Sequence, residues 1–250
     1  MRKYQFINRK QRTWLLKRYP WLADNNNMTV LDGILYLLRS GCQWRLIPGR
    51  FGNWKTIYHH FRSWSERGHF LNMLHRLVRR KRCKCKQRIE PTVVIIDSQS
   101  VRSGLPNSCK GIDGNKKVKG IKRHIVVDSN GFPLNAVATT ANVHDSRGAW
   151  PLIAQIMVSH PAAVSVKADR GYAGNAKLVR ENIQGLRFNC VKSNYGTTGF
   201  VPLEGRWVVE RTIAWLDNYR RLARNYECLL TTATSMAVIG CFAIMLKHAS

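Results

Sequence analysis

The hydrophobic pattern of this 250-residue chain changes its period near residue 92. Before that point apolar residues recur at helical spacing, whereas residues 92–96 (TVVII) form a β-branched run typical of a strand buried on both faces. Further strand-like runs follow and then alternate with helical ones. This order predicts an α/β fold, with a mixed sheet flanked by helices and a small helical domain in front of it.

A run of positive charge divides the chain. Residues 79–91 are mostly Lys and Arg and end at Pro91, and the run lacks core residues. We therefore predict a helical domain over residues 1–78 and a basic linker over 79–91, which could also follow phosphates. A second domain is expected over residues 92–250.

The helical domain carries signals for two helices. Thr29 and Asp32 resemble a capping box, which predicts a helix through Leu38, and Gly41 supplies a stop. The turn-rich residues 47–53 lead into a second amphipathic helix. Its outer face carries Lys55, His59 and Arg62. Such a helix–turn–helix is compatible with docking in the major groove of DNA, although a plain helical bundle with a solvated basic face would show the same pattern.

The second domain is predicted to begin with strands. Runs at 124–128 and 135–140 flank the turn Ser129-Asn130-Gly131, which indicates a hairpin. The later elements expected are a helix at 147–158, a strand at 163–168, a helix at 175–182, a strand at 188–191 and helices at 206–222 and 233–247. The apolar run 236–246 is shorter than the roughly 20 residues that cross a bilayer, so it predicts a buried helix and no membrane partner.

The charge balance predicts a polyanionic partner. The chain has 41 Lys and Arg against 14 Asp and Glu, a net charge of +27. DNA or RNA is the expected partner rather than anionic lipid. The seven cysteines are scattered without a C-x-x-C pair, and the first residues are basic and polar. These features favour free thiols in a reducing cytoplasm and no secretory signal.

Three of the few acids fall at informative places. Asp97 and Asp169 each end a hydrophobic strand-like run, and adjacent parallel strands would bring the two side chains together at one edge of the sheet. Two neighbouring carboxylates repel, and a divalent cation relieves that repulsion. A single Asp after a strand is more often a turn or cap residue, so the pair carries the hypothesis.

Glu210 is the candidate third ligand. At about 100° of rotation per residue, one stripe of the late helix holds Arg206, Glu210, Ala214, Asp217 and Arg221. A solvent-facing Glu210 paired with Arg206 or Arg211 is the alternative. Three carboxylates suit magnesium, which takes oxygen ligands and supports phosphoryl transfer.

Several stretches resemble DDE transposases of bacterial insertion sequences, in the insertion-sequence-five family. The matching residues are 32–44 (DGILYLLRSGCQW), 97–101 (DSQSV), 114–124 (GNKKVKGIKRH), 141–145 (ANVHD), 168–172 (ADRGY) and 206–216 (RWVVERTIAWL). The resemblance covers nearly the whole chain in the right order. It implies an RNase H-like catalytic domain whose catalytic and metal-binding acids are Asp97, Asp169 and Glu210.

The resemblance also implies an activity. It is cleavage and strand transfer at the terminal inverted repeats of an element, dependent on magnesium, with manganese as the substitute ion. The partners implied are double-stranded DNA, both ends and target, and at least a second copy of the chain, in the bacterial cytoplasm with the nucleoid. Hydrolysis without strand transfer and non-catalytic nucleic-acid binding remain the alternatives from the residues alone.

One departure from the wider group surrounds the last acid. Leu203 stands where many relatives have Tyr, and Asp217 where they have Lys, so Arg220, Arg221 or Arg224 would hold the DNA end. The DNA contacts expected overall are Lys55, His59, Arg62, Lys116, Lys117, Lys119, Lys122, Arg123, Arg206, Arg220 and Arg221. His144-Asp145 fits either a position beside the site or a helix cap.

Overall fold

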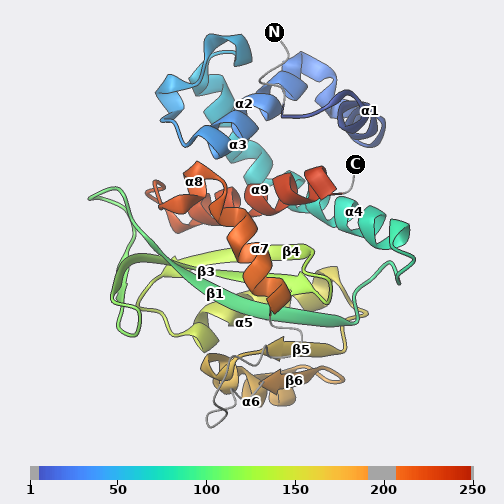
Figure 1. Cartoon of the computed structure of the whole chain (residues 1–250), viewed down its shortest axis with the longest axis vertical. Helices are drawn as coiled ribbons and strands as arrows, with labels where there is room; N and C mark the ends of the chain where they lie inside the picture. Colours follow the sequence, from blue (N-terminus) through green and yellow to red (C-terminus); the bar gives the residue numbers. More distant parts are fainter. Residues whose placement is uncertain (1–5, 191–206, 249–250) are drawn as a thin grey trace.

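The computed structural model describes residues 6–190 and 207–248, and Figure 1 shows helices stacked against one sheet. The N-terminal part is helical. Its helices are α1 (Arg9–Arg18), α2 (Asn27–Ser40), α3 (Trp54–Glu66) and α4 (His69–Lys84), joined by short 3-10 turns. The apolar faces of these helices meet in the same hydrophobic core that continues into the sheet.

The sheet is mixed, as the sequence predicts. Its strands are β1 (Val93–Arg102), β2 (Gly111–Asp113), β3 (Val118–Asp128), β4 (Pro133–Thr140), β5 (Ser165–Ala168) and β6 (Arg187–Cys190). They lie in the order β2-β3-β1-β5-β6, and β4 also pairs with β3. The pairs β1–β3 and β3–β4 are antiparallel, and β1–β5 and β5–β6 are parallel. The expected hairpin is confirmed, with its turn at Gly131 in the left-handed region (φ 78°).

Helices cover both faces of the sheet because side chains alternate along each strand. The later helices are α5 (Asp145–Ser159), α6 (Ala173–Asn182), α7 (Trp207–Asp217), α8 (Arg220–Ala223) and α9 (Leu230–His248). Val101 packs with Ala233 of α9, and α7 packs on β1 and β3, so these helices share one face. On the opposite face, Ser98 hydrogen-bonds Asp145 at the start of α5.

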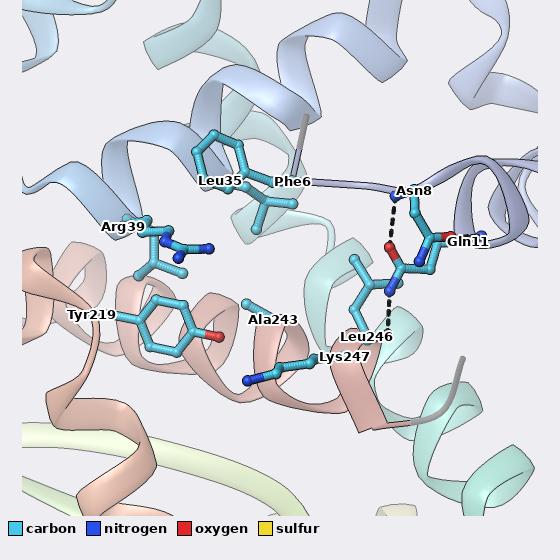
Figure 2. A pocket seen from close by; sticks show the side chains of 10 residues that line it. Phe6, Asn8, Gln11, Leu35, Arg39, Tyr219, Ala243, Leu246 and Lys247 are labelled. Carbon is cyan, nitrogen blue, oxygen red and sulfur yellow. Dashed lines mark hydrogen bonds between the residues drawn. The ribbon is translucent and has the colours of Figure 1, made fainter. Parts of the chain in front are cut away.

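α9 joins the N-terminal helices to the sheet. It packs against α4, α2 and β4, and most of its side chains are buried. Figure 2 shows the junction, where Gln11 Nε2 donates to the carbonyl of Leu246 (2.7 Å) beside a cavity of 270 Å³. Among the described residues α9 alone has the length and apolar composition of a membrane span, but its position is that of a core helix.

Two local predictions for the N-terminal helices have different outcomes. Gly41 ends α2 in the left-handed region (φ 69°), as expected. The capping box is wrong, because α2 begins at Asn27 and its N-cap Asn26 makes no side-chain hydrogen bond. Asp32 is instead buried and ion-paired with Arg12 at 2.6 Å. Its pairing with a distant helix is a tertiary contact that local spacing does not encode.

The expected linker is also corrected. α4 continues through Lys84, so residues 79–84 are helical. Arg82 is buried, 5% exposed, and its guanidinium pairs with the carboxylate of Asp128. Asp128 also stabilises the β3–β4 turn, because it accepts hydrogen bonds from the backbone of Asn130 and Phe132 (2.9 Å each). The basic run is thus anchored to the β3–β4 turn.

Candidate active site

The parallel pairing of β1 with β5 places Asp97 and Asp169 on neighbouring strands. Val93 pairs with Ser165 and Ile95 with Lys167, and Asp97 and Asp169 each lie two residues beyond this last pair. In-register residues of a parallel pair project from the same face, and neighbouring strands are about 4.8 Å apart. The predicted parallel arrangement is confirmed. The strand prediction is wrong in one detail: β1 continues through Arg102, so Asp97 lies within it, while Asp169 directly follows β5.

Backbone amides orient both carboxylates. Asp97 Oδ1 accepts a hydrogen bond from the N–H of Ser98 at 2.7 Å. Asp169 Oδ1 accepts one from the N–H of Gly171 at 2.9 Å, at the start of a short 3-10 turn. Both side chains are half-buried. One oxygen of each carboxylate is therefore held in place by a backbone N–H group.

A third carboxylate, Asp145, lies beside this pair. Its Oδ1 accepts from Ser98 Oγ at 2.9 Å and is 3.0 Å from Lys122 Nζ. A Cβ at Gly171 would lie 3.1 Å from both Asp145 Oδ2 and Asp169 Oδ1, so these two carboxylates face the same small space. His144, not Asp145, caps α5 by accepting from the N–H of Ser146. Of the two roles expected for His144-Asp145, His144 has the helix cap and Asp145 has the position beside the site.

Tyr172 marks the centre of the acidic cluster. Its ring is fully buried. Burial, reinforced by the carboxylates of Asp97, Asp145 and Asp169, raises the pKa of its hydroxyl well above the ordinary value. The hydroxyl thus remains protonated beside the three acids. It extends the group that the sequence identifies, since Tyr172 closes the motif ADRGY.

Glu210 lies on the face of the sheet that carries Asp97. It is exposed in the first turn of α7. On the same helical stripe, Asp217 accepts from Gln99 Nε2 at 2.8 Å through each carboxylate oxygen. Gln99 is two residues beyond Asp97 and therefore points from the same side of β1. Within the described residues, however, no three His, Cys, Asp or Glu side chains gather closely enough to hold a metal ion.

The residues present still suit a hard cation. Asp97 and Asp169 offer carboxylate oxygens side by side, which is the ligand chemistry that magnesium takes with one or two protein carboxylates and water. Lys122, the cation nearest to Asp145, approaches that residue from β3. Asp97 and Asp169 thus lie on adjacent parallel strands, and Glu210 lies on α7, which packs on β1.

The expected DNA contacts divide into exposed and buried residues. Exposed or half-exposed are Lys55, His59 and Arg62 on α3, Lys116, Lys117 and Lys119 around the β2–β3 turn, and Arg220 on α8. Arg62 also pairs with Glu66 at 2.9 Å. Arg206 lies outside the described residues, as do Leu203 and the expected strand residue Val191.

Three of the expected contacts are corrected by burial: Lys122, Arg123 and Arg221 are 6%, 2% and 6% exposed. Lys122 Nζ donates to the carbonyl of Val143 (3.0 Å) and pairs with Asp145. Arg123 donates to the carbonyl of Leu222 (2.7 Å), and burial lowers its pKa to about 10. Arg221 pairs with Glu227 at 2.7 Å. Their charges serve internal contacts because β3 is covered on both faces.

Comparisons with known proteins agree with this arrangement. The family described as "Transposase DDE domain" matches residues 88–246, which is more than half of the chain. The chain belongs to the DDE transposase family. Residues 17–74 match a second family, described as a putative transposase of the IS4/5 family. The DDE match begins within the expected linker and contains the whole sheet, and the second match lies in the helical region before it.

Two curated relatives share part of this DDE transposase sequence. A putative transposase for insertion sequence element IS402 from Burkholderia cepacia is 37% identical over 130 residues, 49% of this chain and 61% of that protein. An uncharacterized protein, y4sN, from Sinorhizobium fredii (strain NBRC 101917 / NGR234) is 37% identical over 54 residues, 22% of this chain and 43% of that protein. The chain thus spans less than two thirds of each of these relatives.

Proposed function

We propose that this DDE transposase cleaves DNA at the terminal inverted repeats of an insertion sequence and joins the freed ends to target DNA. The observation that supports the proposal is the parallel pairing of β1 and β5, because Asp97 and Asp169 each lie two residues beyond the last pair, Ile95 and Lys167. Family membership supports the same reaction class.

Asp97 and Asp169 would hold magnesium, with manganese as a substitute, and Glu210 would complete the ligand set from α7. When bound, two such ions activate the attacking oxygen and stabilise the leaving oxygen in an in-line displacement. The residues of this chain hold and orient the acids: the N–H groups of Ser98 and Gly171 fix Asp97 and Asp169. The contact between Asp217 and Gln99 keeps α7 over β1.

The proposed substrate is double-stranded DNA, bound in the cytoplasm by the exposed basic residues. These are Lys55, His59 and Arg62 on α3, Lys116, Lys117 and Lys119, and Arg220, each of which is exposed or half-exposed. The net charge of +27 supports a polyanionic substrate. Because an element has two ends, we propose at least a homodimer on DNA.

Incubation with supercoiled plasmid that bears the inverted repeats separates three outcomes. Joined products support transposition. Nicks or breaks without joining would favour a nuclease, and intact plasmid that is nevertheless bound would favour a non-catalytic DNA-binding protein. Asp97→Ala, Asp169→Ala and Glu210→Ala should each abolish cleavage and leave end binding largely intact. Cleavage retained by Glu210→Ala would instead indicate that Glu204 or Asp217 is the third metal-binding acid.

A further inference from the structure

A basic groove opens at the far end of β1 from the acids. It has a volume of 560 Å³ and is formed by residues 102–119 together with Arg224, which is distant from them in sequence. Its lining residues are Arg102, Ser103, Gly104, Leu105, Pro106, Lys110, Lys117, Lys119 and Arg224. Five of these nine residues carry a positive charge and none carries a negative one. They come from the end of β1 and the segment after it, from the start of β3 with the residue before it, and from the residue that follows α8.

The walls of the groove are fixed by backbone hydrogen bonds. The N–H of Asn225 donates to the carbonyl of Arg102 at 2.9 Å, and the N–H of Gly104 donates to the carbonyl of Asn225 at 2.8 Å. On the other wall, the N–H of Ser103 donates to the carbonyl of Lys119 at 3.2 Å. Gly104 is required here, because a Cβ would lie 2.7 Å from the Tyr226 ring. The cations are thus held on a rigid frame.

Among the residues that the structure describes, the acids near the groove already have other partners. Asp113 accepts from Ser100 Oγ at 2.5 Å and from the N–H groups of Asn115 and Lys116. Glu227 is buried against Arg221. Of the five cations, Lys110 already has partners within the same segment, because its Nζ donates to the carbonyls of Leu105 and Pro106. Arg102, Lys117, Lys119 and Arg224 are exposed.

The groove lies at the end of the strand that carries Asp97. Lys119 projects from the same face of the sheet as Asp97, because it is four residues from Arg123, which pairs with Gln99. Asp217 contacts Gln99 between the two sites, and Asn225 bridges to Ser103 just beyond β1. Arg102 is five residues beyond Asp97, which corresponds to about 16 Å along a strand. At about 3.4 Å per nucleotide step, this is on the order of five nucleotides.

We propose that this groove binds backbone phosphates of the DNA strand that is cut at the acids, about five nucleotides from the scissile phosphate. The inference rests on the proposed function and deepens it by placing one segment of the substrate. Arg102 and Arg224 act here with Lys117 and Lys119, and the four charges match a run of phosphates. Phosphate contacts of this kind fix the position of the DNA without reading its sequence.

The first test is the salt dependence of duplex binding, measured without divalent ions so that cleavage plays no part. Lys117→Ala/Lys119→Ala should lower the slope of log K against log salt by about 0.9 for each phosphate that the variant no longer neutralises. Lys177→Ala/Arg180→Ala on α6 removes the same charge from exposed positions and is the control. Equal slopes for the two double variants would overturn the proposal that the groove binds phosphates.

The second test locates the phosphates. Duplexes that carry the inverted repeat with a single neutral methylphosphonate at successive positions are scanned for weaker binding. The wild-type protein should bind less tightly when the substitution lies about five nucleotides from the cut. Arg102→Ala/Arg224→Ala should bind the duplex with that substitution as tightly as the unsubstituted duplex. A decrease that persists in the variant would overturn the proposal. Absence of cleavage by the wild-type protein with magnesium would instead count against the proposed function alone.

Discussion

The ammonium of Lys122 lies 3.0 Å from Asp145 Oδ1 and 3.9 Å from Asp113 Oδ2, so one buried cation separates two acids. Through Asp145 this contact reaches the candidate active site. Ser98 donates its hydroxyl to Asp145 and its backbone N–H to Asp97. The relationship connects the face of the sheet under α5 to the acids on the face under α7.

Asp145→Asn should weaken the response to metal without unfolding the protein. The amide keeps an acceptor for Ser98 but removes a negative charge next to Asp97 and Asp169. A unit charge at this range is worth on the order of 1–3 kcal/mol, so half-maximal cleavage should require about tenfold more magnesium. Cleavage rates over a magnesium titration measure this shift, and manganese binding followed by electron paramagnetic resonance should move in parallel.

Asp113→Asn is the matched control for that experiment. Asp113 shares Lys122 with Asp145, yet its serine partner is Ser100 and not Ser98. The magnesium requirement of Asp113→Asn should stay within about twofold of that of the wild type, because the charge of Asp113 lies further from Asp97 and Asp169 than the charge of Asp145 does. Equal shifts in the two variants would show that only the local charge balance around Lys122 matters.

Gly171→Ala should impair cleavage selectively. The added methyl group would lie 3.1 Å from a carboxylate oxygen of each of Asp145 and Asp169, so both side chains must shift. Misplacement of a reacting group by about 1 Å costs roughly a hundredfold in rate, so a shift of a few tenths of an ångström should lower the cleavage rate by about three- to fivefold while duplex binding is unchanged. Gly174→Ala, on the next helix, approaches only Ser146 at 3.3 Å and should keep its rate. A normal rate in Gly171→Ala would contradict the compact site.

The sequence predicts the parts of this site that depend on local pattern. The β-branched run before Asp97, the hairpin and the strand before Asp169 are all present. A general property of α/β sheets predicts that the strands before Asp97 and Asp169 are parallel neighbours, and the pairing of β1 with β5 confirms this prediction. Gly41 and its left-handed conformation are equally local.

Contacts between distant segments lie beyond such a pattern. Lys122 and Arg123 resemble surface cations in the sequence because their burial depends on helices far away along the chain, including α8, which supplies the Leu222 carbonyl. Arg82 resembles part of a linker because its partner, Asp128, is 46 residues away. The position of Asp145 at the start of α5 depends on contacts with Ser98 of β1 and Lys122 of β3.

Arg82→Ala should strongly destabilise the protein. Asp128 has 0% exposure and would lose its cation, and breaking a buried pair on one side typically costs about 3–5 kcal/mol. Urea unfolding measures the change. Lys84→Ala, two residues later on the exposed side of the same helix, should change the free energy of unfolding by less than about 0.5 kcal/mol. Equal stability of the two variants would show that the buried pair of Arg82 and Asp128 does not stabilise the fold.

Acid should destabilise the fold through two buried imidazoles. Burial lowers the pKa of His75 and of His124 to about 4, from an ordinary value of 6.5. A depressed histidine pKa means that the unfolded chain binds the proton more tightly, so this contribution is complete above pH 6.5 and is lost as pH falls toward 4. The free energy of unfolding from urea titrations should therefore decrease across that window. His75→Gln retains a donor for the Leu134 carbonyl, which His75 Nε2 contacts at 2.9 Å, and cannot titrate. Its stability should fall less steeply than that of the wild type, and an identical slope would show that His75 is not a source of the pH dependence.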